Sequence, residues 1–419
     1  MSNSNNNSIS KSRLLSYGVF GFSISIILLC CVSVIFPALI TNTNSEFSEF
    51  PFYSQQVDSF EIGVLAIPFV ILNTIVLLIG IIYYKKHYSL NRLFDFDVSK
   101  KVAIISIAII LSAYIITTIP EFEKDEEFAD YIKVETRLNE SIHENRFTFE
   151  DAISGNPNYS SIEPHVKYSL LIISEKIFGD FRVIAFIASI ALLIATFAIT
   201  QEITKKRIPG ILAMLLVLQS NTFLSYDTSA AYSNFWILFY LLSLYLVIKK
   251  WQFTHISFVL SIFSKLISTV FLPLTIFFVL NNTKGKKRMY ILIFYAVLII
   301  IALIFVSNSN ILTEDKITYL PENFVEGFTQ FTYQLRFDPI ILIFLLPLTV
   351  TLFLKSLKGF QQANSIQILI AGFLLIPPLL ITFSQQTNEP YRLIPLVVFF
   401  AIGVSVLLTK IKQDEPLSK

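Results

Sequence analysis

The chain has 419 residues, of which 54% are hydrophobic and 15% charged, and its mean hydropathy is +0.66. Because a soluble domain carries about 25% charged residues, this composition excludes an ordinary soluble protein and indicates an integral membrane protein. The formal net charge of +2 is too small to suggest a nucleic-acid partner.

Apolar runs long enough to cross a hydrocarbon core of about 30 Å follow one another along the whole chain. The first run contains the only two cysteines, Cys30 and Cys31, whose adjacency offers neither a disulfide framework nor a cysteine metal site. This run is too long for the apolar part of a signal peptide, so we expect a retained anchor. We predict an all-α polytopic membrane protein whose apolar runs cover 14–40, 61–84, 101–119, 181–203, 208–226, 230–248, 254–281, 289–306, 339–354, 364–384 and 392–409.

Lysine and arginine collect between alternate runs, and cytoplasmic loops carry the excess of these residues. The loops between the basic clusters are acidic or neutral. We therefore expect a multi-pass protein of the cell membrane, with both termini cytoplasmic. The basic clusters are Lys11/Arg13, Lys85/Lys86/Arg92/Lys100/Lys101, Lys205/Lys206/Arg207, Lys249/Lys250, Lys284/Lys286/Lys287/Arg288, Lys355/Lys358 and Lys410/Lys412.

The run 254–281 breaks this alternation because both of its flanks are basic. A single helix would put the flanks on opposite sides of the membrane. We therefore predict a hairpin of two short helices, 254–266 and 268–281, that turns at Lys265–Ser268 near the outer face. Pro273 suits such a broken helix. The hairpin brings the expected number of crossings to about twelve.

The predicted spans divide the chain into two parts. Residues 1–100 form an N-terminal two-span extension with a cytoplasmic loop, and 101–419 form the transmembrane core. Within the core, 120–180 is an acidic extracytoplasmic loop, and its segment His165–Phe178 predicts an interfacial helix that ends at Gly179. A loop of this length between membrane helices is usually functional.

Several polar residues are drawn by this topology to the outer membrane boundary. Carboxylates there could act as a base or bind a metal ion, and cations suit a phosphate group. Each residue also has an ordinary structural interpretation, such as a solvated acid, an interfacial histidine, a helix cap or a membrane anchor. Lys265 is the hardest to explain in that way, because a lysine within an apolar run costs roughly 2.5–3.5 kcal/mol. The candidates are Asp125, Glu126, His165, Asp227, Lys265, Tyr391 and Arg392.

Five motifs occur in an order similar to that of a known family. The chain resembles the GT-C class of membrane glycosyltransferases, in particular the dolichyl-phosphate-mannose–protein mannosyltransferase and aminoarabinose-transferase group. The resemblance runs from about residue 101 to 409, and two additional spans precede it. Its motifs are DEEFADY (125–131), EPHVKYSLLIISEKIFGDFR (163–182), FLSYDTSAAYSNFWILFYLLSLYLVI (223–248), ISFVLSIFSKLISTVFLPLTI (256–276) and PYRLIPLVVF (390–399).

This resemblance implies transfer of a sugar from a polyprenyl-phosphate donor to a glycan, lipid or protein acceptor, with inversion, on the extracytoplasmic face. Asp125 would be the catalytic base, with Glu126 as the second choice, and Asp125 would also help to hold a divalent metal ion if one is used. The other candidates would contact the two substrates: Lys265, Tyr391 and Arg392 the donor phosphate, and His165 and Asp227 the acceptor.

Two other functions fit the same residues. Broken helices with a buried lysine also form the substrate sites of transporters, so a transporter or lipid flippase is the main alternative. A non-catalytic scaffold, with the acidic loop as its docking surface, is the third. Repeat symmetry would favour a transporter, but the sequence shows no convincing internal repeat, and its polar residues gather at the outer rim rather than in mid-span.

Overall fold

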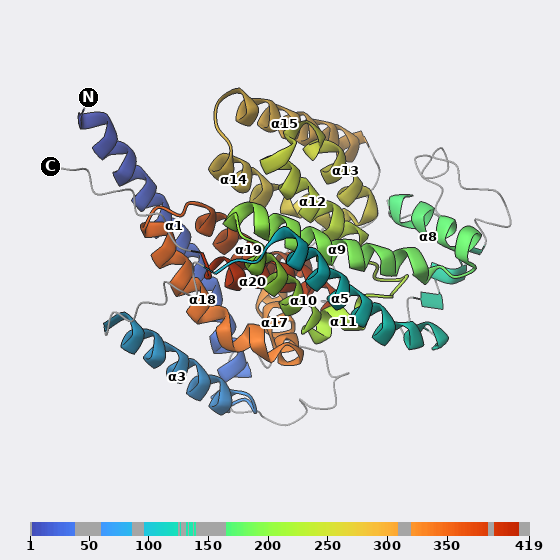
Figure 1. Ribbon diagram of the computed structural model, residues 1–419, viewed down its shortest axis with the longest axis horizontal. Helices are drawn as coiled ribbons and strands as arrows, with labels where there is room; N and C mark the ends of the chain where they lie inside the picture. The colour runs from blue at the N-terminus through green and yellow to red at the C-terminus, as the bar shows by residue number, and fades with distance from the viewer. Residues whose placement is uncertain are drawn as a thin grey trace. The chain divides into compact units, whose positions relative to one another are not determined.

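The computed structural model describes residues 2–37, 60–85, 96–124, 126, 131–132, 134–136, 138–139, 165–308, 320–383 and 389–409. Within these ranges the secondary structure is helical and includes no strand (Figure 1). The chain forms two compact units. We call Asp97–Phe294 the central unit, and Met1–Phe96 with Tyr295–Lys419 the terminal unit. The extension expected over 1–100 is thus grouped with the last part of the chain.

Among the residues that the structure describes, five helices are long and apolar enough to cross a membrane: Arg13–Ile35, Lys100–Glu123, Arg182–Thr204, Pro339–Leu357 and Gln362–Thr382. Shorter apolar helices cover Ala66–Ile82, Arg207–Leu218, Phe235–Lys249, Leu266–Asn282 and Pro390–Val406. These helices fit a helical membrane protein, as the composition predicted. The number of twelve crossings stays a prediction.

The central unit is built around α9 and α12. Helix α9 packs against α8, α10 and α12, and α12 also packs against α13. Gly210 lets α10 approach α9 closely, because a Cβ atom there would lie 2.6 Å from Cδ2 of Phe197. The helices of this unit are α5 (Lys100–Thr118), η1 (Ile119–Glu123), α8 (His165–Phe178), α9 (Arg182–Thr204), α10 (Arg207–Leu218), α11 (Asn221–Tyr226), α12 (Phe235–Lys249), η3 (Trp251–Phe253), α13 (Thr254–Ser264), η4 (Leu266–Phe271), α14 (Leu272–Asn282) and α15 (Gly285–Asn308), which continues into the terminal unit.

Two of the expected spans differ from the helices found. The apolar run 208–226 is divided at Ser220, whose Oγ accepts a hydrogen bond from Phe223 N at 3.1 Å and so begins a new helix, α11. The run 230–248 becomes helical only at Phe235. Before it, Asp227–Asn234 is irregular. Hydropathy alone could not find this segment, because its small residues are as compatible with a span as with a loop.

The expected break at Lys265 is confirmed. Lys265 has an extended backbone (φ −162°, ψ 124°) and separates α13 from η4 and α14. Before the break, Ser261 Oγ donates to the carbonyl oxygen of Trp236 near the start of α12 (2.7 Å). After it, Thr275 Oγ1 lies 3.4 Å from the hydroxyl oxygen of Tyr240. The chain therefore runs along α12 toward its start, and then turns back.

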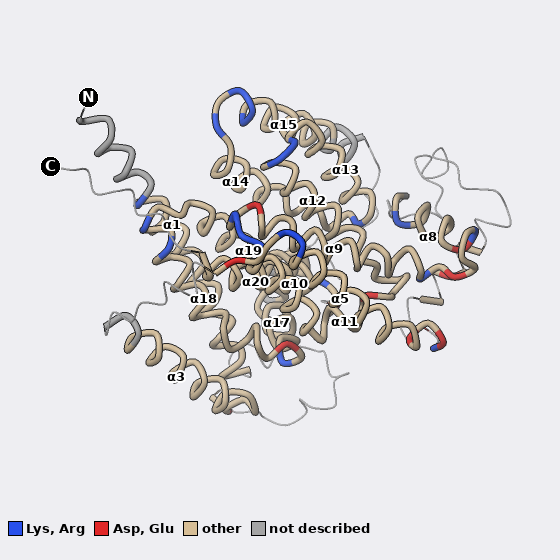
Figure 2. Tube along the Cα trace, viewed as in Figure 1, with Lys and Arg blue, Asp and Glu red and all other residues tan. Residues whose placement is uncertain are grey.

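Contacts connect three basic clusters of the central unit near the Lys249 end of α12; Figure 2 marks the lysines and arginines in blue. Glu202, near the end of α9, accepts a hydrogen bond from Lys249 Nζ at 2.7 Å and also pairs with Lys205. Lys287, in the first turn of α15, reaches the carbonyl oxygen of Ile248 at 3.4 Å. The three clusters around Lys205, Lys249 and Lys287 thus lie at one end of the unit. This is the arrangement that the alternation of charge along the sequence requires.

The terminal unit is built around α19, which packs against α1, α17, α18 and α20. Polar contacts tie its helices together within the apolar interior. Asn364 Nδ2 donates to Ser16 Oγ at 3.1 Å, and Lys355 Nζ donates to the carbonyl oxygen of Thr409 at 2.7 Å, beyond the end of α20. Its helices are α1 (Ser2–Ile35), α3 (Ala66–Lys85), α17 (Pro321–Tyr333), η5 (Gln334–Phe337), α18 (Pro339–Leu357), α19 (Gln362–Phe383), η6 (Pro390–Leu393) and α20 (Ile394–Val406).

Candidate functional site

The irregular segment Asp227–Asn234 is the meeting point of the candidate residues in the central unit. It connects α11 to α12, and most of its backbone groups lie outside the hydrogen bonding of these helices. Such groups need partners when they are buried. Backbone partners come from Glu126, from Lys167 in α8 and from Ser189 in α9. Lys265, at the hairpin turn, contacts the ring of Tyr232. We call Asp227–Asn234 the junction segment.

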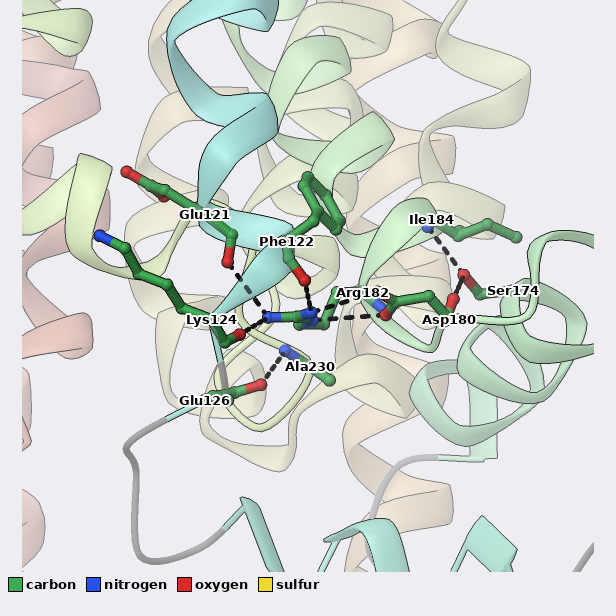
Figure 3. Close-up of polar contacts among 9 residues, drawn as sticks. All are labelled: Glu121, Phe122, Lys124, Glu126, Ser174, Asp180, Arg182, Ile184 and Ala230. Atoms are coloured by element: carbon green, nitrogen blue, oxygen red, sulfur yellow. Dashed lines mark hydrogen bonds and ion pairs between the residues drawn. The ribbon is translucent and has the colours of Figure 1, made fainter.

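Glu126 binds the junction segment through its carboxylate. Ser229 Oγ donates to Oε1 at 2.5 Å, Ala230 N to Oε2 at 2.9 Å, and Ala231 N to Oε1 at 3.2 Å. Figure 3 shows the contact with Ala230. A carboxylate offers about four acceptor positions, so three of those on Glu126 are already used. This geometry favours a positioning role for Glu126 over the role of second-choice base.

Asp227 begins the junction segment and is only 1% exposed. The Tyr114 hydroxyl group donates to Oδ2 at 2.6 Å, and Oδ1 has no hydrogen bond among the described residues. Burial raises the pKa of Asp227 to about 7, although the hydrogen bond from Tyr114 opposes this shift. A carboxyl group of this kind can hold or release a proton near neutral pH.

The backbone at Asp227 is also fixed. Ser189 Oγ, from α9, donates to the carbonyl oxygen of Asp227 at 2.7 Å. Asn234 Nδ2 donates to the same Ser189 Oγ at 2.9 Å. One serine hydroxyl therefore joins both ends of the junction segment to α9. No pattern in the sequence indicates this role for Ser189, which lies within an apolar run.

Two lysines approach the junction segment. Lys265 Nζ, at the hairpin turn, lies 5.5 Å from the ring centroid of Tyr232, the distance of a cation–π contact. Lys167 Nζ, from α8, donates to the carbonyl oxygen of Ala231, and this lysine is only 8% exposed. Lys167 was not predicted as a site residue. Its signal in the sequence was a charged residue near the start of a largely apolar helix.

Arg182 fixes the backbone that leads into the acidic loop (Figure 3). Its guanidinium group donates to the carboxylate of Asp180, with an Nη2–Oδ2 distance of 3.2 Å. The same group reaches three carbonyl oxygens at the end of η1 and just beyond it. These are the carbonyl oxygens of Lys124 (2.7 Å), Phe122 (2.5 Å) and Glu121 (3.4 Å). Asp125 follows directly, so Arg182 and Glu126 hold the chain on either side of it.

The turn that carries Asp180 also anchors α8. Helix α8 ends at Phe178, as the sequence predicted, and Gly179 follows with φ +72°, a conformation that favours glycine. Ser174 Oγ, in the last turn but one, donates to the carbonyl oxygen of Asp180 at 2.6 Å and accepts from Ile184 N at 3.0 Å. The angle between α8 and α9 is therefore set by hydrogen bonds.

The described part of the structure does not place the remaining candidates at this site. Asp125 and the side chain of His165 lie outside them. Tyr391 and Arg392 belong to the terminal unit, where Arg392 Nε donates to the Tyr391 hydroxyl oxygen at 3.4 Å and both side chains are buried. Their approach to Lys265 stays a prediction. Within the described ranges, no group of three or more His, Cys, Asp or Glu residues could hold a metal ion.

Comparisons with known proteins identify no family for this chain. The chain matches no protein-family model, no curated protein and no solved structure. The class that the fold and the composition support is a helical membrane protein. Any more particular function depends on the residues at the junction segment.

Proposed function

We propose that the chain is a membrane glycosyltransferase of the GT-C kind, which transfers a sugar from a polyprenyl-phosphate donor to an acceptor on the extracytoplasmic face. The acceptor would be a hydroxyl group of a glycan, a lipid or a protein. Its family resemblance rests on motifs in the sequence. Its physical support comes from the junction segment within the third motif, which residues of the first, second and fourth motifs contact.

The observation that carries the proposal is the meeting of Glu126 and Lys265 on one short segment. Glu126 binds the backbone N–H groups of Ala230 and Ala231, and Lys265 lies over the ring of Tyr232, the next residue. An acidic loop and a lysine at a helix break therefore share a site, although they are far apart in the chain. A carboxylate beside a cation is what a transfer reaction with a phosphate leaving group requires.

In the proposed reaction, the acceptor oxygen attacks the anomeric carbon of the donor sugar from the face opposite the phosphate. The new carbon–oxygen bond forms as the bond between the anomeric carbon and the phosphate oxygen breaks, so the configuration inverts. Asp125 takes the proton from the acceptor hydroxyl group. The polyprenyl phosphate leaves with the bonding electron pair, and Lys265 stabilises the negative charge that grows on its oxygen.

The other residues of the site position these groups. Glu126 and Arg182 hold the chain on both sides of Asp125, and Lys167 holds the carbonyl oxygen of Ala231. Asp227 and His165 line the acceptor side. Because Asp227 is protonated below a pH of about 7, it can donate a hydrogen bond to an acceptor group without adding a negative charge beside the donor phosphate.

The test is sugar transfer by the purified chain in reconstituted membranes, from a labelled polyprenyl-phosphate donor. Asp125→Asn should abolish transfer while expression and thermal stability stay unchanged. The matched control is Glu123→Gln, two residues earlier, which removes an exposed carboxylate of the same acidic run and should retain activity. Full activity of Asp125→Asn would overturn the assignment of the base. Absence of transfer by the wild-type chain from hexose and pentose donors, together with movement of the lipid across the membrane, would favour a flippase instead.

A further inference from the structure

Arg336, in the terminal unit, lies against two aromatic rings. Its guanidinium carbon is 4.0 Å from the ring centroid of Tyr333 and 4.6 Å from that of Phe337. All three residues lie at the end of α17 and in η5, within five positions of the chain. Both rings are 45% exposed, and Arg336 is exposed as well. The rings are therefore not part of the interior, and they hold the guanidinium group at the surface.

The guanidinium group keeps its hydrogen-bonding capacity. In the part of the chain that the structure describes, Arg336 makes no hydrogen bond and no ion pair, and its contacts are those with the two rings. The nearby acid Asp338 is 4% exposed and has other interactions. A guanidinium group has five N–H donors in a planar fork. Contact with the ring faces leaves these donors, which lie in the plane, available to a ligand.

The position of Arg336 in the fold indicates which kind of ligand its guanidinium group binds. Helix α18 begins at Pro339, three residues after Arg336, and is one of the helices long and apolar enough to cross a membrane. Helix α17, on the other side, buries Phe328 and Phe331 and exposes Val325 and Tyr333. Arg336 therefore stands at the end of a candidate span. Aromatic residues at that position in other membrane proteins lie at the level of the lipid headgroups.

We propose that Arg336, held by Tyr333 and Phe337, binds the phosphate group of a phospholipid headgroup. Phosphate is the anion present at that depth, and arginine binds it with two parallel hydrogen bonds. The rings contribute by fixing the guanidinium plane and by covering its apolar faces, which reduces the conformational freedom lost on binding. The site lies in the terminal unit and does not depend on the proposed glycosyl transfer.

The experiment measures lipid adducts of the purified full-length chain by native mass spectrometry. The probe is phosphatidylglycerol, and the comparison is diacylglycerol, which has the same acyl chains but no phosphate. Arg336→Gln should weaken phosphatidylglycerol binding by about tenfold, since it removes a charge-assisted hydrogen-bonding pair. Binding of diacylglycerol should not change. Arg336→Lys should have an intermediate effect, because lysine keeps the charge but not the planar fork.

Arg13→Gln is the matched control, because Arg13 is also an exposed arginine at the start of a candidate span. It should bind phosphatidylglycerol as the wild-type chain does. Equal binding by Arg336→Gln and the wild-type chain, or an equal loss in Arg13→Gln, would overturn the proposal. Competition with added inorganic phosphate distinguishes a lipid headgroup from a soluble phosphate as the ligand. Lack of competition supports a lipid headgroup, whereas displacement of the lipid at millimolar phosphate would overturn the lipid assignment in favour of a soluble phosphate.

Discussion

The Tyr114 hydroxyl group donates a 2.6 Å hydrogen bond to Asp227 Oδ2, which joins the last part of α5 to the residue after α11. This contact fixes a carboxyl group that is almost completely buried. A buried carboxyl group without a cation is unfavourable in its ionised form. The pair therefore makes the unit sensitive to pH.

We predict that the stability of the chain falls as the pH rises through this region, and that Asp227 causes much of the fall. Its pKa is about 7 in the folded state and about 3.9 in an unfolded chain. Between these values the folded state binds more protons than the unfolded state, so the free energy of unfolding decreases with increasing pH. Asp227→Asn, which cannot ionise, should remove this slope.

Thermal unfolding in detergent at pH 5 and pH 8 measures the effect. Asp227→Asn should gain stability relative to the wild-type chain at pH 8, and much less at pH 5. Tyr114→Phe should give the opposite result: it removes the hydrogen bond that opposes the rise in the pKa of Asp227, and so widens the pH range over which stability is lost. An identical pH slope in the wild-type chain and Asp227→Asn would show that Asp227 does not titrate in this range.

We predict that Glu126→Gln loosens the junction segment. Both carboxylate oxygens of Glu126 accept hydrogen bonds, Oε2 from Ala230 N and Oε1 from Ala231 N. A glutamine has only one oxygen, so its amide N–H₂ group must face one of these donors. The cost should be about 1–3 kcal/mol of unfolding free energy.

Hydrogen exchange locates this change. The backbone amides of Ala230 and Ala231 should exchange faster in Glu126→Gln, and amides near the Lys249 end of α12 should not. Glu123→Gln is the control, because Glu123 is an exposed acid three residues earlier. Unchanged protection at Ala230 in Glu126→Gln would mean that the carboxylate does not hold the segment in solution.

How far the sequence could predict this arrangement depends on the range of the interaction. The apolar runs predicted most of the helices, and the basic residues on both flanks of 254–281 predicted the break at Lys265. Both patterns can be seen within one stretch of the chain. The end of α8 at Phe178 followed from Gly179 in the same way. The contact of Lys167 with Ala231 could not be predicted, since any buried lysine needs an acceptor and the sequence does not say which of many carbonyl oxygens is close. The same holds for Arg182 and the carbonyl oxygens that it binds.

We predict that Arg182→Lys disorders the entry to the acidic loop. Lysine keeps the charge near Asp180, but a single ammonium group cannot reach the carbonyl oxygens of Phe122 and Lys124 together. The loss should be about 1.5–3 kcal/mol, seen as a lower unfolding temperature and as faster cleavage by protease after Lys124. Arg13→Lys is the control and should behave as the wild-type chain. Equal rates of cleavage after Lys124 in Arg182→Lys and the wild-type chain would argue against the positioning role.

Lys265 gives the sharpest kinetic prediction, because it follows from both the helix break and the proposed reaction. Its ammonium group lies over the ring of Tyr232 and would contact the donor phosphate before and during transfer. Lys265→Gln should raise KM for the polyprenyl-phosphate donor by roughly 10–100-fold, the equivalent of one charge-assisted hydrogen bond. KM for the acceptor should stay the same, and Lys265→Arg should restore most of the donor affinity.

Substitutions of Tyr232 test the position of the Lys265 ammonium group while its charge is kept. Tyr232→Phe keeps a ring under the ammonium group and should leave KM for the donor nearly unchanged. Tyr232→Leu removes the cation–π contact, worth about 0.5–2 kcal/mol, and should raise KM for the donor several-fold while Lys265 is still present. Lys176→Gln is the control, an exposed lysine of α8 outside the site. If Lys265→Gln leaves both kcat and KM for the donor unchanged, or raises donor and acceptor KM equally, Lys265 does not bind the donor phosphate, and the helix break has a structural role instead.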